Sequence, residues 1–131
     1  MATEGIQGFY IETRNYGATA AFWVSLGFKN VVETDHGSGR WEHPSGGPYV
    51  FISETAEEEL AMGPILRVAD ATRFAPDRAP EFAQPFAPQH WGVMEALICD
   101  PDGRKISLEA PLPDGVDAPP EPRHHTAYGT D

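Results

Sequence analysis

The chain has 131 residues, enough for one domain with its own hydrophobic core and without disulfides or structural metals as supports. A hydrophobic content of 40%, with 11% aromatic residues, is typical of a globular protein and excludes an intrinsically disordered chain. The 20 acidic against 9 basic residues give a net charge of −11, which disfavours nucleic acid and anionic lipid as partners and favours neutral or cationic ligands.

The opening residues "MATEGIQ" contain no basic segment followed by an apolar run, so they do not resemble a secretory signal. No apolar stretch approaches the roughly 18 residues expected of a membrane span. A single cysteine, Cys99, leaves no disulfide framework and fits a reducing compartment. These features predict a cytoplasmic protein with no membrane partner.

The first half of the chain predicts the order β-α-β-β-β. Residues 5–14, "GIQGFYIETR", are rich in aromatic and β-branched residues and predict a strand. Asn15 is placed to cap a helix over "YGATAAFWVSLGF", which Gly27 is expected to end. Three short strands are then predicted between turn residues, at 28–35, 38–44 and 47–54.

The second half predicts the same order less clearly. Residues 62–69, "MGPILRVA", predict a strand, and Asp70 is expected to cap a helix within 71–86 that three prolines keep short. Strands are predicted at 90–100 and 105–111, on either side of the turn "PDGR". The Pro-rich segment 112–131 is expected to be either a disordered tail or an extended arm lying on a partner.

The two halves also match each other in sequence. Residues 12–19 align with 67–74 at an offset of 55, and 45–54 align with 101–110 at an offset of 56. We therefore expect an α+β fold in which two β-α-β-β-β modules, about 5–55 and 61–111, form a curled mixed sheet with a cleft. Both modules would belong to a single domain over residues 1–111.

Two motifs resemble the glyoxalase/bleomycin-resistance/dioxygenase superfamily, also called vicinal oxygen chelate proteins. "AAFWVSLGF" (20–28) resembles its "FYxxLGF" helix end, and "HWGVMEALICDPDGRKISLEAP" (90–111) resembles its "WGxxxxxxxDPDGNxIEL" ending. The resemblance covers about residues 6–111. It implies two β-α-β-β-β modules around a cleft, and a homodimer, because members of the superfamily are commonly dimeric.

The resemblance also implies where a divalent metal would be bound. Its four ligand positions, on the first and last strand of each module, fall here on Gly8, Phe51, Gly63 and Ser107. None of these is His, Glu or Gln, the side chains that would bind such an ion. We therefore expect no metal and no cofactor, which argues against a glyoxalase-type isomerase or an extradiol dioxygenase.

Period-two alternation predicts which side chains face the cleft. On the first strand these are Gly8, Tyr10 and Glu12, and on the fourth strand they are Tyr49 and Phe51. The third strand is expected to offer Trp41 and His43, with Arg40 and Glu42 on its opposite face. The second module would add side chains of its own, namely Arg67, Ser107 and Glu109, with His90 and Trp91 at the mouth of the cleft.

An aromatic cavity with few polar groups suits a large, flat, partly polar molecule. The resemblance extends to metal-less members that protect antibiotic producers by binding the drug. It thus implies a non-catalytic self-resistance protein that sequesters a planar aromatic antibiotic of bleomycin, mitomycin or enediyne type. No catalytic residue is expected, since Cys99 has no activating base beside it.

Several alternatives remain open. Tyr49 and Phe51 could pack against a partner subunit, and Trp41 could cover a sheet edge. The chain could instead be a metal-independent lyase, isomerase or epimerase that uses Glu12, Glu109, His43 or His90 as acid or base. A small-metabolite sensor with the same cleft is the third interpretation.

Overall fold

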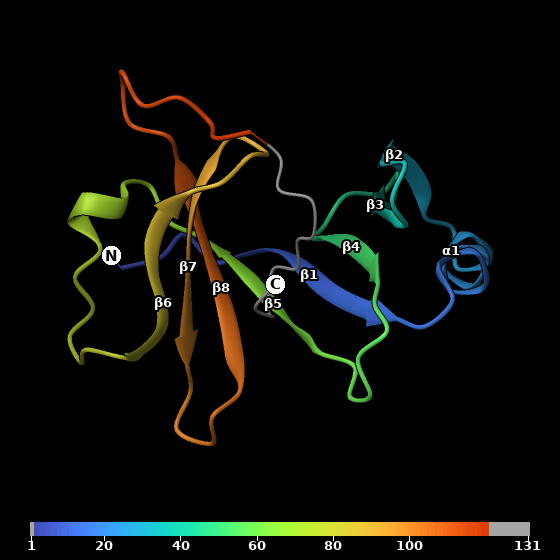
Figure 1. The fold of residues 1–131 in the computed structure, drawn as a ribbon, viewed down its shortest axis with the longest axis horizontal. Coiled ribbons are helices and arrows are strands. Elements are labelled where there is room, and N and C mark those ends of the chain that lie inside the picture. The colour runs from blue at the N-terminus through green and yellow to red at the C-terminus, as the bar shows by residue number, and fades with distance from the viewer. Residues whose placement is uncertain (1, 121–131) are drawn as a thin grey trace. The chain divides into compact units, whose positions relative to one another are not determined.

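A computed structural model describes residues 2–120 of the chain (Figure 1). Within this part the fold is α+β, with one α-helix, one short 3-10 helix and eight strands. The described residues divide into two compact units: the first unit is 7–64, and the second unit is 2–6 together with 65–120. Among these residues, no helix has the length and apolar character needed to cross a membrane.

The first unit has the predicted order of elements. They are β1 (Ile6–Thr13), α1 (Tyr16–Ser25), β2 (Lys29–Glu33), β3 (Ser38–Glu42) and β4 (Tyr49–Glu54). The strands lie in the order β2-β3-β4-β1, with β1 and β4 parallel and the other neighbours antiparallel. The β-α-β-β-β order expected for this half is confirmed.

Helix α1 begins and ends at the residues that the sequence indicated. The Asn15 side chain accepts a hydrogen bond from the backbone N–H of Ala18 at 3.0 Å, which satisfies one of the unpaired donors of the first turn. At the other end Gly27 has a φ of 98°, where a residue with a side chain would be strained. A Cβ there would also lie 2.8 Å from Nε2 of His43, so the His43 ring would have to shift to admit it.

The helix covers one face of the first unit's sheet. Ala20 of α1 packs with Trp41, Val50 and Ile52, and Ile52 is fully buried. Ile11 and Phe28 are among the partly buried side chains around this cluster. The opposite face of the same sheet carries the odd-numbered residues of β4, because successive side chains of a strand alternate between its faces.

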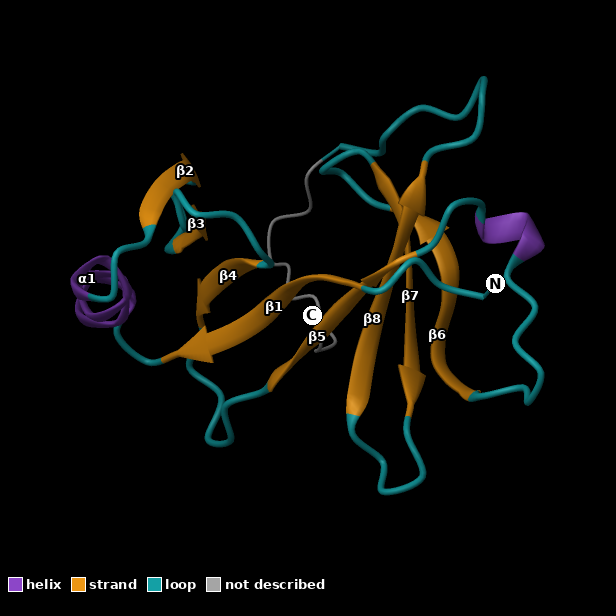
Figure 2. Cartoon of the chain, turned by 180° about the vertical axis from the view of Figure 1, so that it is seen from behind, coloured by secondary structure: helices purple, strands orange, loops and turns teal. Residues whose placement is uncertain are grey.

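The second unit repeats this topology (Figure 2). Its elements are β5 (Met62–Arg67), the 3-10 helix η1 (Ala71–Arg73), β6 (Glu81–Pro88), β7 (Val93–Cys99) and β8 (Lys105–Pro111). The strands lie in the order β5-β8-β7-β6, with β5 parallel to β8. Across the parallel strands, Tyr10 is the partner of Phe51 in the first unit, and Ile65 is the partner of Ser107 in the second. Tyr10 and Ile65 are 55 residues apart and Phe51 and Ser107 are 56 apart, which are the offsets found in the sequence.

One element of the second unit, β6, was not located from the sequence. A short helix was expected within 71–86; it is the three residues of η1, capped by Asp70, and the strand β6 follows it at Glu81–Pro88. The proline rings at 76 and 80 prevent the helix from continuing. Pro85 is tolerated in β6 because β6 is an edge strand of the sheet. One side of an edge strand has no neighbour, so the N–H that proline lacks is not needed for a hydrogen bond there.

The core of the second unit lies on the η1 side of its sheet. Val68, Ala96, Leu108 and Ala110 form a buried cluster, with Phe74 and Phe86 packed against it. The even-numbered residues of β7 and β8 thus fill this core. Their odd-numbered residues, including Glu95, Ser107 and Glu109, occupy the opposite face.

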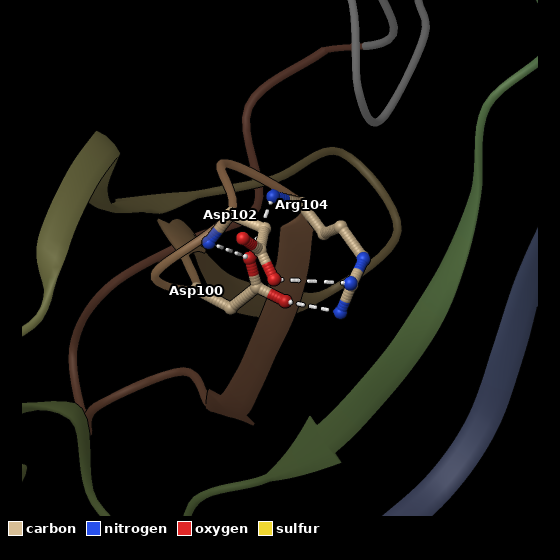
Figure 3. A network of polar contacts seen from close by, with 3 residues as sticks. All are labelled: Asp100, Asp102 and Arg104. Carbon is tan, nitrogen blue, oxygen red and sulfur yellow. Dashed lines mark hydrogen bonds and ion pairs between the residues drawn. The ribbon is translucent and has the colours of Figure 1, made fainter.

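The turn between β7 and β8 is held by its own side chains (Figure 3). Oδ1 of Asp100 accepts from the backbone N–H groups of Asp102 at 2.9 Å and Arg104 at 2.8 Å. The Arg104 guanidinium then bridges both carboxylates, at 3.0 Å to Asp100 and 3.2 Å to Asp102. This network fixes the register of the hairpin and hence which residues of β7 and β8 face each other.

Candidate functional site

The four positions at which the superfamily resemblance implies metal ligands do not fit a metal. A Cβ on Gly8 would lie 2.6 Å from the ring of Tyr49, so this ring fills the space that a ligand side chain would need. Phe51 has no donor atom, and Gly63 has no side chain. The Ser107 hydroxyl is buried and donates to Glu95 at 2.9 Å. Within residues 2–120 no group of three or more His, Cys, Asp or Glu side chains is placed to hold an ion.

The first unit instead carries a layer of rings, here called the aromatic face, on the side of its sheet away from α1. Its residues are Tyr10, Glu12, Arg40, Tyr49 and Phe51. Tyr10 stacks with Phe51 at a centroid separation of 6.3 Å and an interplanar angle of 13°. The Arg40 guanidinium lies 3.9 Å from the centroid of the Tyr49 ring, which is cation–π geometry.

Exposure differs across the aromatic face. Tyr10 and Tyr49 are 3% and 9% exposed, whereas Phe51 and Arg40 are half-buried. Tyr10 therefore supports Phe51 from behind, and Tyr49 supports Arg40. The surface available for contact with another molecule is made by Phe51 and Arg40.

Glu12 lies in the same face and is fully hydrogen-bonded. It is 7% exposed; Oε2 accepts from the Tyr10 hydroxyl at 3.0 Å, and Oε1 accepts from the backbone N–H of Ala61 at 2.9 Å. Both carboxylate oxygens thus have donors within the first unit. This arrangement ties β1 to the segment that precedes β5.

Trp41 and His43 were predicted to face the cleft, and the structure places them on the other side of the sheet. Trp41 is part of the core under α1, and the His43 ring packs edge-on against Phe28 at 5.3 Å. Across the strands, Arg40 is the partner of Phe51 and Trp41 the partner of Val50. Arg40 therefore takes the place that the sequence had assigned to Trp41.

The second unit carries a polar arrangement, here called the carboxyl face: Glu95, Ser107, Glu109 and Trp91. Glu95 is 4% exposed and accepts from Ser107, while Glu109 accepts from the Trp91 indole N–H at 3.3 Å. Glu95 and Glu109 are direct partners across β7 and β8. Burial, reinforced by the charge of Glu109, raises the pKa of Glu95 to about 8, and the Ser107 hydrogen bond only partly opposes this.

The sequence analysis did not single out Glu95, although a signal was present. In "VMEALIC" the residues Met94, Ala96 and Ile98 follow the period of a strand with one buried face. Glu95 is then the charged residue of the other face, opposite Glu109 once the "DPDGR" turn sets the register. Ser107, expected to touch a ligand, is instead 1% exposed and committed to Glu95.

The remaining candidates lie in the second unit. Arg67 is exposed and is the strand partner of Glu109. His90 is half-buried and packs edge-on against Trp91 at 5.0 Å. Trp91 itself is 38% exposed. Of the predicted site residues, the structure thus gathers Tyr10, Glu12, Tyr49 and Phe51 in the first unit, and it gathers Arg67, His90, Trp91, Ser107 and Glu109 in the second.

Comparison with solved structures identifies the fold. A glyoxalase/bleomycin resistance protein/dioxygenase superfamily member from Vibrio splendidus 12B01 has a TM-score of 0.62 and 16% identity, over 79% of this chain and 96% of that chain. The Mn(II)-bound glyoxalase from Novosphingobium aromaticivorans has a TM-score of 0.63 and 14% identity, over 82% of this chain. The chain has the fold of this superfamily.

At these identities the likeness shows the fold and leaves the activity open. The alignment spans only 39% of the Novosphingobium glyoxalase. A protein described as NAD-dependent benzaldehyde dehydrogenase from Legionella pneumophila also matches, with a TM-score of 0.56 and 13% identity over 79% of this chain and 99% of that chain. No family model and no curated protein sequence matches the chain.

Proposed function

We propose that the protein binds and sequesters a planar aromatic antibiotic of bleomycin, mitomycin or enediyne type, without making or breaking a bond. It would act as a cytoplasmic homodimer in self-resistance. The observation that carries the proposal is the Tyr49 ring over Gly8, because an aromatic side chain fills the space of a metal ligand. The superfamily whose fold the chain has is itself named in part for bleomycin resistance proteins.

The aromatic face supports a flat ligand. Phe51 is half-buried and backed by the nearly parallel Tyr10 ring, so it is a pre-formed surface for stacking. Stacking on such a ring contributes about 0.5–1.5 kcal/mol beyond the burial of area. Arg40, held over Tyr49 and paired with Glu42 at 2.8 Å, offers a donor at the edge of this surface.

In the second unit, taken by itself, Trp91, Glu109, Arg67 and His90 are proposed as ligand contacts. Trp91 is the exposed ring of the carboxyl face, and its orientation is set by the bond to Glu109. The net charge of −11 favours a ligand with a basic nitrogen.

The proposal is tested by fluorescence titration and calorimetry against bleomycin, mitomycin and an anthraquinone-bearing enediyne, followed by recovery of the ligand and determination of its mass. We expect saturable binding of at least one compound at one per site, with the compound returned unchanged. Turnover, or no binding by any of the three, would contradict sequestration of this class.

A matched pair of variants locates the binding surface. Phe51→Ala removes the stacking ring and is expected to weaken binding about tenfold, since a tenfold change in affinity corresponds to about 1.4 kcal/mol. Phe22→Ala is the control, because Phe22 is 58% exposed on α1 and lies outside the aromatic face. Equal losses in the two variants would argue against the aromatic face as the binding surface.

A second candidate function is favoured by one observation, the buried carboxyl group of Glu95. A carboxyl group that holds its proton near neutral pH can act as a general acid or base in a metal-independent lyase, isomerase or epimerase. In that case a substrate would be converted rather than returned. Glu95→Gln would then abolish turnover, whereas it would leave stoichiometric binding of an antibiotic intact near neutral pH.

A further inference from the structure

The carboxyl face places two glutamates next to each other in a way that ordinary sheet packing avoids. Directly opposed residues of antiparallel strands have Cβ atoms about 4.5–5.5 Å apart, and like charges there destabilise the pair. Glu95 and Glu109 are such a pair. The two glutamates accept hydrogen bonds from different side chains. Glu95 accepts from the buried Ser107, and Glu109 accepts from the exposed Trp91.

The two carboxyl groups also differ in solvent access. Glu95 is 4% exposed, while Glu109 is half-buried. Proton binding at Glu95 removes the repulsion between the two groups, so Glu109 keeps its hydrogen bond to the indole. Loss of that proton would put two negative charges in register within one hairpin. The more accessible group, Glu109, would then move away and release the Trp91 N–H.

We propose that Glu95, Ser107 and Glu109 form a proton-operated switch that sets the position of Trp91. This inference rests on the proposed function in one respect, because Trp91 is counted there among the ligand contacts. In the protonated state Trp91 is oriented by Glu109. In the deprotonated state the hydrogen bond from Trp91 to Glu109 is lost, the indole changes position, and binding of a planar ligand weakens about tenfold. Glu95 is a positioning residue that acts through Glu109.

Other titratable groups lie around Glu95, and their titration must be distinguished from that of Glu95. Ala87, its partner on β6, has no titratable group. The pKa of Glu95, raised to about 8, lies close to the ordinary range of a thiol, so Cys99 on the same strand needs a control. The groups to consider from β5, β6, β7, β8 and the loop before β7 are Arg67, Glu81, Cys99, Lys105, Glu109 and His90.

The test follows tryptophan emission of the ligand-free protein between pH 5 and 10. We expect a shift in emission with a midpoint near pH 8, absent in Trp91→Phe and absent in Glu95→Gln, which mimics the protonated side chain. Cys99→Ser and His90→Gln should both keep the midpoint. Persistence of the shift in Glu95→Gln, or no shift in the unmodified chain, would overturn the switch.

A second measurement identifies the titrating atom. Carbon NMR of the glutamate carboxyl groups should show one resonance that titrates near pH 8, lost in Glu95→Gln and moved to lower pH in Glu109→Gln. A Glu95 resonance that titrates in the ordinary range of glutamate would overturn the proposal. Because both measurements use ligand-free protein, they fail or succeed independently of antibiotic binding.

Discussion

The two units of the chain build chemically different faces on one strand arrangement. Where the first unit pairs Tyr10 with Phe51, the second pairs Ile65 with Ser107. The position of Ser38, opposite Ser53, corresponds to that of Glu95, opposite Glu109. Rings fill the first face, while the second is left with a buried carboxyl group, so an equivalent backbone does not imply an equivalent site.

The two units differ most clearly in how they surround their buried glutamates, Glu12 and Glu95. Glu12 has a donor on each oxygen, the Tyr10 hydroxyl and the Ala61 N–H. Glu95 has the Ser107 hydroxyl and faces another carboxyl group. Burying a charged group is favourable only when hydrogen bonds replace its water, which the first unit supplies more completely. The same residue type thus stabilises one unit and destabilises the other as the pH rises.

The largest expected effect is on the pH dependence of stability. The pKa of Glu95 is raised from 4.5 to about 8 in the folded chain, so its stabilising contribution is fully present below pH 4.5 and is lost as the pH rises to about 8. Glu95→Gln cannot ionise. Between pH 5 and 9, the stability of the variant relative to the unmodified chain should rise on the order of 3–5 kcal/mol. Urea unfolding at both pH values measures this, and a pH-independent difference would contradict it.

The next effect concerns the ring that fills the metal position. Gly8→Ala puts a Cβ 2.6 Å from the Tyr49 ring, and such overpacking is expected to cost about 1–3 kcal/mol. In a Tyr49→Ala background the same change should cost almost nothing, because the ring is absent. A double-mutant cycle by urea unfolding gives the coupling. Additive costs would show that Tyr49 does not restrict position 8.

A smaller effect is expected at Glu12, where replacement by glutamine should lower stability, whereas Glu95→Gln should raise it. Glu12→Gln keeps one acceptor oxygen and replaces the other with an NH₂ group. The variant can therefore accept a hydrogen bond from the Tyr10 hydroxyl or from the Ala61 N–H, but not from both. We expect a loss of about 1–2 kcal/mol at pH 7. Thermal unfolding of the two glutamine variants side by side tests the comparison. If both variants gained stability, the hydrogen bonds to Glu12 would contribute nothing.

The smallest effect is expected in the turn of the second unit. The pKa of Asp100 is lowered, first by the backbone N–H of Arg104, so its contribution is present above its ordinary pKa of 3.8 and is lost as the pH falls through the lowered value. Asp100→Asn keeps the oxygen that accepts the two backbone N–H groups and should be milder than Asp100→Ala. Acid unfolding curves measure the difference, and equal curves would show that the turn bonds do not stabilise the hairpin.

The sequence by itself determined the local signals: Asn15 and Gly27 bounding α1, Asp70 as a cap, and the alternation of β1, β4 and β8. It also determined the internal repeat, because the offsets of 55 and 56 are those at which the strands pair. Each of these depends on neighbouring residues or on a fixed period, so one stretch of chain carries the information.

Only the tertiary structure decided three other features. Which face of β3 meets α1 depends on its register with β4, and this put Arg40 beside Tyr49 and Trp41 in the core. Residues 81–88 became a strand because β7 offered an edge to pair with. The pKa of Glu95 is raised by burial and by Glu109, which is 14 residues away in sequence and directly opposite in space. Alternation gives two faces to every strand, and packing against its neighbours decides which face is buried.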